Sequence, residues 1–75
     1  MEPIYDMHCR LVCCAVPAKG LISHRFRGER VFIRLPVGGE VVFARDDAAT
    51  VIRRVSPTQF RVDSFPCEHI DFSSG

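Results

Sequence analysis

Cysteine and histidine are the residue types in this chain most able to bind a metal ion or to act as nucleophiles. The 75 residues include four cysteines and three histidines. Structural zinc is held by four such ligands, which proteins usually supply as two pairs that are close in sequence. Cys67 and His69 form one candidate pair, because side chains two residues apart lie on the same face of an extended segment. The second pair would have to be Cys9 with Cys13 or Cys14.

The geometry of the second pair decides whether a zinc site can form. On a strand, Cys9 and Cys13 would share a face but lie about 13 Å apart, since each residue advances the chain by ~3.3 Å. Only a helical segment would bring both thiols to the same ion. The apolar run over residues 9–16 fits a buried strand or a buried helical turn, and we favour the strand.

We therefore expect the cysteines to pack as small hydrophobic residues, with no bound metal ion and no other cofactor. The alternative is a small zinc- or thiol-dependent protein that uses Cys9, Cys13, Cys67 and His69.

No other set of residue types completes a catalytic pattern. Ser23-His24 lacks the glycines of a nucleophile elbow, and Gly38-Gly39 lacks the spacing and the lysine of a phosphate-binding loop. Asp46 and Asp47 could bind a divalent ion, but they are explained more simply as residues at the start of a helix, where they cap it. A chain of this length also has little room for an enclosed pocket. The sequence predicts that the protein is not an enzyme.

One segment combines arginine with phenylalanine in a way that is typical of binding surfaces. Residues 24–34 read HRFRGERVFIR, in which Glu29 is the only acidic residue. Arginine and aromatic residues are the usual anchors of protein interfaces, and the same pair can stack on a base while contacting phosphate. We interpret the segment as a partner-binding surface. Its residues are Arg25, Arg27, Arg30, Phe32 and Arg34.

The formal net charge of only +1 bears on which class of partner this surface binds. Nucleic-acid-binding domains are usually strongly basic, so we expect a partner protein, or self-association into a homo-oligomer, before nucleic acid. A nucleic-acid-binding small barrel is a further alternative. So is a purely solvated face, in which the arginines form salt bridges and Phe32 covers a second core under a helix. The acidic partners would then be Glu29, Glu40, Asp46 and Asp63.

The composition is that of a folded domain, with 47% hydrophobic and 25% charged residues. We expect one small domain spanning residues 1–75. No apolar run approaches the ~20 residues that cross a bilayer, and residues 1–6 are acidic where a signal peptide would be basic. The sequence thus predicts a cytoplasmic protein with reduced cysteines and no membrane association.

Glycine and proline divide the chain into short segments that are rich in Val, Ile, Phe and Arg, which is typical of a small barrel or sandwich. We expect a hairpin over residues 30–44, with a three-residue loop and Gly39 in the left-handed conformation. This register gathers five apolar side chains on one face and leaves Arg30, Phe32 and Arg34 on the other. The apolar set is Val31, Ile33, Leu35, Val41 and Phe43.

Ala48, Val51, Ile52 and Val55 recur at helical spacing, with Asp46 placed to cap the first turn. They predict a short helix near residues 46–55. Further strands are expected at residues 9–16, 21–26 and 59–65, with residues 69–72 as an optional last strand. Together these elements predict a mainly β (small α+β) fold: a five- to six-stranded antiparallel barrel of SH3-like or Sm-like architecture with one short helix.

Overall fold

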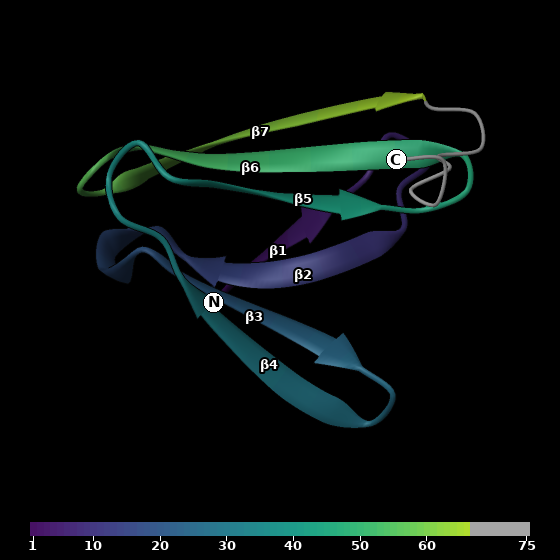
Figure 1. The fold of residues 1–75 in the computed structure, drawn as a ribbon, viewed down its shortest axis with the longest axis horizontal. Helices are drawn as coiled ribbons and strands as arrows, with labels where there is room; N and C mark the ends of the chain where they lie inside the picture. The colour runs from purple at the N-terminus through teal and green to yellow at the C-terminus, as the bar shows by residue number, and fades with distance from the viewer. Residues whose placement is uncertain (67–75) are drawn as a thin grey trace, which may run out of the picture.

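The computed structural model of the chain describes residues 1–66, which form seven β-strands in two antiparallel sheets (Figure 1). The first sheet has the order β1-β2-β3-β4 and the second the order β5-β6-β7, so every pair of hydrogen-bonded neighbours is also consecutive in sequence. The strands of the first sheet are β1 (Glu2–Tyr5), β2 (Leu11–Val16), β3 (Leu21–Phe26) and β4 (Glu29–Arg34). Those of the second are β5 (Glu40–Ala44), β6 (Ala48–Ser56) and β7 (Gln59–Pro66).

Two turns of the first sheet follow directly from the local sequence. Between β2 and β3, the 3-10 turn η1 (Pro17–Lys19) ends at Gly20, whose φ of 64° is one that glycine adopts without steric penalty. Between β3 and β4, Arg27 and Gly28 have φ values of 51° and 81° and connect the paired residues Phe26 and Glu29. Two consecutive positive φ values define the type I′ turn, whose twist matches that of the strands.

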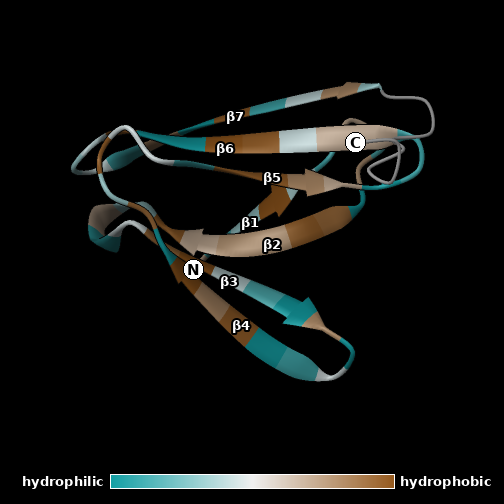
Figure 2. Cartoon of the chain, viewed as in Figure 1, coloured by the Kyte–Doolittle hydropathy of each residue, from teal (hydrophilic) through white to brown (hydrophobic). Residues whose placement is uncertain are grey.

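The core lies between the two sheets. Ile22 of β3 and Ile52 of β6 are each 0% exposed, and both belong to strands that have neighbours on both sides. The other buried residues of the cluster are Ile4, Val12, Cys13, Ala15 and Leu35. Ile33, Val41, Phe43 and Phe60 pack against it. Figure 2 shows apolar residues along the parts of the strands that face this core, and hydrophilic residues toward the far end of the β3–β4 hairpin.

The expected hairpin over residues 30–44 is wrong, although both of its strands are present. β4 pairs with β3 and β5 pairs with β6, so the segment between them crosses from one sheet to the other. Leu35 begins the crossing, where its amide donates to Gly20 O at 2.8 Å. Gly38, not Gly39, takes the positive φ of 88°. The prediction that the five apolar residues share one buried face is partly confirmed. Four of them pack in or against the core, and Val31 is 39% exposed.

The expected helix near residues 46–55 is also wrong, because residues 48–56 form the central strand of the second sheet. A spacing of four residues is shared by a strand and a helix, so Ala48 and Ile52 fit both. In the strand Thr50 is buried between them, at 1% exposure, whereas Val55 of the helical pattern is 47% exposed. The β-branched content of β6 and its pairing on both edges favour the strand. Asp46, expected to cap the helix, lies in the β5–β6 turn, where Arg45 N donates to Ala48 O.

Arg54 of β6 holds the crossing segment in place. Its guanidinium donates from Nη1 to Leu35 O at 2.9 Å and from Nη2 to Pro57 O at 2.8 Å. Its main chain accepts a hydrogen bond from Gly38 N and donates one to Gly39 O. One residue therefore connects β6, the crossing between the sheets and the β6–β7 turn.

The described residues thus give a mainly β fold with almost no helix, and with seven strands where five or six were expected. Their ladders form two sheets and no closed barrel, so the SH3-like or Sm-like barrel stays a prediction. The optional strand at residues 69–72 lies outside the described residues. Over residues 1–66, no helix has the length and apolar character needed to cross a membrane.

Candidate functional site

The expected partner-binding surface lies on the β3–β4 hairpin, which extends away from the second sheet (Figure 1). Side chains alternate between the two faces of the hairpin, and residues paired across it share a face. The register pairs Ser23 with Phe32 and Arg25 with Arg30. These four therefore share the face that points away from the second sheet, together with Arg34. We call Arg25, Arg30, Phe32 and Arg34, with Arg27 at the adjoining turn, the arginine–phenylalanine face.

The side chains of this face are exposed and lack acidic partners. Phe32 is 56% exposed, and the four arginines are all exposed. Among residues 1–66, none of the four arginines forms a salt bridge. Of the acidic partners expected for a salt-bridged face, Asp63 pairs with Arg61, and Glu29, Glu40 and Asp46 form no ion pair within the described residues. Within residues 1–66, the arginines of this face have no acidic partner and Phe32 is not covered, so neither part of the purely structural interpretation is found.

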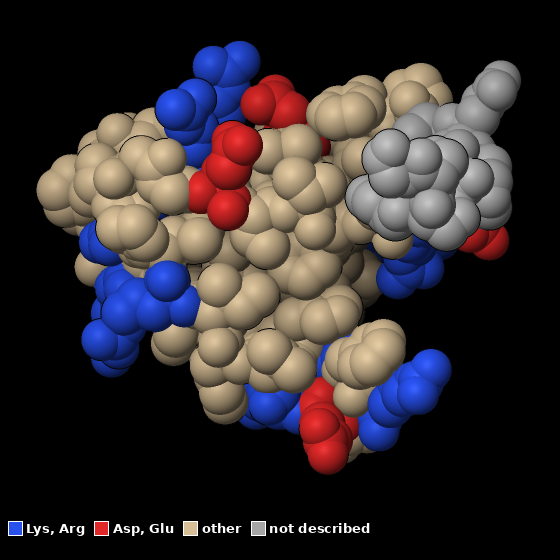
Figure 3. Space-filling view, in the orientation of Figure 1, with Lys and Arg blue, Asp and Glu red and all other residues tan. Residues whose placement is uncertain are grey.

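The register adds a local electrostatic cost. Arg25 and Arg30 are directly opposite each other on neighbouring strands, an arrangement that destabilises a sheet when the charges are alike. A feature that weakens the fold without a visible structural gain is more common at functional sites than elsewhere. Figure 3 shows basic side chains, with acidic atoms between them, at the far end of the hairpin, which stands out from the main body of the molecule.

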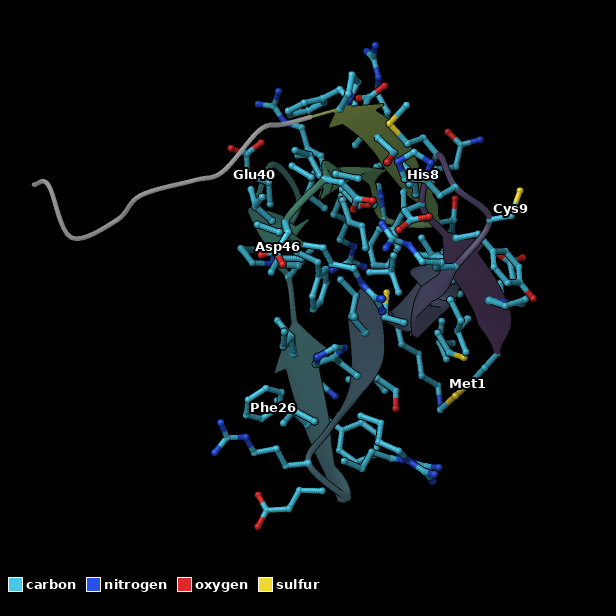
Figure 4. All side chains as sticks on the ribbon, turned by 90° about the vertical axis from the view of Figure 1, so that its right-hand side faces the viewer. Met1, His8, Cys9, Phe26, Glu40 and Asp46 are labelled. Atoms are coloured by element: carbon cyan, nitrogen blue, oxygen red, sulfur yellow. The ribbon has the colours of Figure 1, made fainter. Side chains whose placement is uncertain are left out.

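The opposite face of the hairpin forms one wall of a cleft of about 390 Å³. His24 and Phe26 lie on this wall, and Phe43 and Thr50 of the second sheet lie across from it. The His24 ring is 4.8 Å from the Phe43 ring and 6.5 Å from the Phe26 ring, between centroids. Figure 4 shows Phe26 near the end of the hairpin. The remaining lining residues are Asp6, Val12, Arg25, Arg27, Ala44, Arg45 and Ala48.

Sequence reasoning missed this cleft. From the sequence, His24 was considered beside Ser23, as an incomplete catalytic pair, and Phe26 was assigned no role. The signal that could have found it is the alternation of His24 and Phe26 with Arg25 and Arg27, which places two rings on one face of a strand. Phe43 joins them only through the packing of the two sheets, which the sequence does not specify.

Asp6 organises the β1–β2 turn beside the cleft. Its carboxylate accepts hydrogen bonds from His8 N, Arg10 N and Arg10 Nε, all at 2.9–3.0 Å. Burial acts to raise the pKa of Asp6, but the two backbone amides and the Arg10 guanidinium outweigh it, and the pKa is lowered from its ordinary value. Arg10 also binds Asp47 in the β5–β6 turn, and this hydrogen bond is the main cause of the lowered pKa of Asp47. The network connects the two sheets.

The lowered pKa values predict loss of stability in acid. Because Asp6 and Asp47 have lower pKa values folded than unfolded, their contribution is complete above their ordinary value of 3.8 and is lost as the pH falls through the folded values. We expect the thermal midpoint to fall steeply below about pH 4, and the fall to be shallower in Asp6→Asn. Thermal unfolding followed across this range measures it. Asp63→Asn, which removes an exposed ion pair, is the matched control and should keep the wild-type profile.

The cysteines of the described residues do not form a cluster. Cys13 is buried in β2, and burial, with a smaller contribution from Cys14, raises the pKa of its thiol to about 11. Cys9 is exposed and precedes the strand, in a turn where its φ is 61° (Figure 4). Over residues 1–66, no three His, Cys, Asp or Glu side chains gather as metal ligands. Cys67 and His69 lie outside the described residues.

Comparison with known proteins adds no functional assignment to this geometry. No protein-family model, no curated protein and no solved structure matches the chain.

Proposed function

We propose that this protein is a non-enzymatic interaction module that binds a partner protein through the arginine–phenylalanine face. The observation that carries the proposal is the set of four exposed arginines, unpaired with any acidic residue over residues 1–66, beside the exposed ring of Phe32. Such a surface fits a partner that offers carboxylates around an apolar pocket. Desolvated arginine and aromatic anchors carry most of the binding energy of many interfaces.

The edge of the first sheet favours a protein as the partner. β4 is the last strand of that sheet, and no strand of residues 1–66 pairs with its outer edge. Its backbone amide and carbonyl groups are therefore available to an added strand, a common mode of peptide recognition. Arg30, Phe32 and Arg34 would flank the added strand on one side of the sheet. Nucleic acid would use the arginines but not the backbone edge.

The same edge disfavours self-association. Two copies that paired through β4 would bring the Arg30 and Arg34 side chains of both chains onto a shared sheet. Like charges on adjacent strands are destabilising, and charged edge strands are a common protection against edge-to-edge pairing. We therefore propose a different, acidic protein as the partner rather than a second copy.

Charge reversal and truncation on this face should weaken capture of the partner. Arg30→Glu and Phe32→Ala should each weaken binding by roughly 30-fold, the effect of losing a hot-spot residue worth about 2 kcal/mol. The assay is affinity capture from the native host with quantification by mass spectrometry, followed by titration with the purified partner. Circular dichroism should show unchanged folding, since both side chains are exposed.

Arg53→Glu is the matched control, because Arg53 is also an exposed arginine but lies on the second sheet. It should retain full capture. Equal loss in Arg53→Glu and Arg30→Glu would show a response to net charge alone and would refute a site on the hairpin. Equal capture by Phe32→Ala and the wild type would refute the role of the aromatic ring.

A further inference from the structure

We infer that the cleft on the opposite face of the hairpin binds a nucleotide. The base would stack on the rings of His24, Phe26 and Phe43, and the phosphate would bind Arg25 and Arg27 at the entrance of the cleft. The site lies on the opposite side of the hairpin from Arg30, Phe32 and Arg34, and it shares Arg25 and Arg27 with the arginine–phenylalanine face. The volume of about 390 Å³ falls in the range of small-ligand sites.

The rings of His24, Phe26 and Phe43 provide an aromatic surface that the fold leaves partly exposed. Phe26 is 56% exposed although it faces the cleft, and its ring is inclined by 25° to the ring of His24. Phe43 closes the deeper end, where its ring contacts His24. Aromatic rings of this kind bind bases through stacking, which tolerates any base because every base has a π face.

His24 is held in one orientation and keeps one nitrogen for a ligand. Its Nδ1 lies 3.0 Å from Val12 O, and because a carbonyl can only accept, Nδ1 carries the proton. In the neutral ring Nε2 is then an acceptor, and within residues 1–66 it has no hydrogen-bond partner. An exocyclic amine or imino group of a base could donate to it.

The charges around the cleft favour an anion. Arg25 and Arg27 line it and form no salt bridge within the described part of the chain. Asp6 is the acidic residue among the lining, and its carboxylate is already occupied by Arg10 and two backbone amides. The Arg27 guanidinium lies over the Phe26 ring, 5.2 Å from its centroid. The Phe26 ring and the Arg27 guanidinium therefore lie together at the entrance of the cleft.

The conformation of Arg27 is a second, independent indication. With a φ of 51°, it occupies a type I′ turn position where asparagine or glycine would fit with less strain. Strained backbone at a non-glycine residue is concentrated at functional sites. Arginine at this position weakens the turn, and it places a guanidinium at the mouth of the cleft.

A titration of the full chain with adenosine monophosphate or uridine monophosphate, followed by amide chemical shifts, tests the inference. The shifts should centre on His24, Phe26, Arg27 and Phe43. Adenosine, which lacks the phosphate, and ribose 5-phosphate, which lacks the base, should each bind at least about tenfold more weakly, since each loses one of the two contacts. A short oligouridylate distinguishes a free nucleotide from a single strand, because a strand should bind more tightly and weaken steeply with salt.

Three variants make the outcome specific. Phe26→Ala and Arg27→Asn should each weaken nucleotide binding by about tenfold, whereas Phe32→Ala, on the other face, should leave it unchanged. Arg27→Asn should also keep or raise the thermal midpoint, which excludes unfolding as the cause. Absence of shifts at millimolar nucleotide, equal loss in Phe32→Ala, or binding of an acidic aromatic peptide in place of nucleotides would overturn the inference. Protein capture through Phe32 is measured separately, so either site can fail alone.

Discussion

Replacing Gly20 by alanine should lower the free energy of unfolding by about 3 kcal/mol, the sum of a left-handed backbone penalty and overpacking of a filled site. Gly20 has a φ of 64°, and a Cβ added to it would lie 2.7 Å from Leu35 O and against the Arg54 guanidinium. Leu35 O belongs to the main chain, so a side-chain rotation cannot relieve the contact. Moving it would disturb the bond from Arg54 Nη1 and the bond from Leu35 N to Gly20 O.

Gly28→Ala is the matched control for this substitution. Gly28 also has a positive φ, of 81°, but a Cβ there would meet no atom within 4 Å. Gly28→Ala should lower the free energy of unfolding only through the left-handed backbone penalty, by about 1 kcal/mol. Urea unfolding of the two variants separates backbone conformation from close packing. Equal losses would mean that the contact between the two sheets at Leu35 can relax, and that Arg54 does not fix the crossing.

Ile52→Ala is expected to have a comparable effect, through a cavity at the centre of the core. Ile52 is 0% exposed and pairs with Val41 on one side and Val62 on the other. Truncation of a buried isoleucine typically costs 2–5 kcal/mol, or about 3 kcal/mol at a site that cannot collapse. A single core of this size rarely supplies more than roughly 5 kcal/mol, so most of the stability should be lost.

The milder Ile52→Val keeps the measurement within range, with an expected loss of about 1 kcal/mol. Val55→Ala, on the same strand, is the exposed control and should change stability by less than about 0.5 kcal/mol. Chemical denaturation of all three variants gives the comparison. If Val55→Ala were as damaging as Ile52→Ala, then the face of β6 that carries Val55 would be buried, which would contradict its 47% exposure.

Most strands were predictable from short segments that are either alternating or continuously apolar and are bounded by turn residues. The strand expected over residues 9–16 forms over residues 11–16, the segments 21–26 and 59–65 form strands, and β4 and β5 have the expected bounds within about one residue. Residues 48–56 were mistaken for a helix because Ala48 and Ile52 satisfy both periods, and only the pairing with β5 and β7 decides between them. Local pattern does not contain that information.

Strand partners were less predictable than strands. Gly38-Gly39 is a strong turn signal, yet the turn connects two sheets instead of two neighbouring strands. The type I′ turn that does form a hairpin, at Arg27-Gly28, has arginine where the sequence pattern expects asparagine or aspartate. The outer face of β4 was predictable because it depends only on the alternation of side chains along one strand. The cleft was not, because it depends on how the two sheets pack against each other.

The strict order of the strands has a consequence for how the chain folds. Because each ladder joins consecutive strands, the first sheet can form completely from residues 2–34 before any residue of the second is needed. The loops that must close are short, and chains dominated by such local contacts fold faster than β proteins with distant pairings. We therefore expect the slow step to be the docking of the two sheets, which buries Ile22 and Ile52 in one core. On a ribosome, the hairpin that carries both proposed sites would emerge and fold before the half of the protein that completes the cleft.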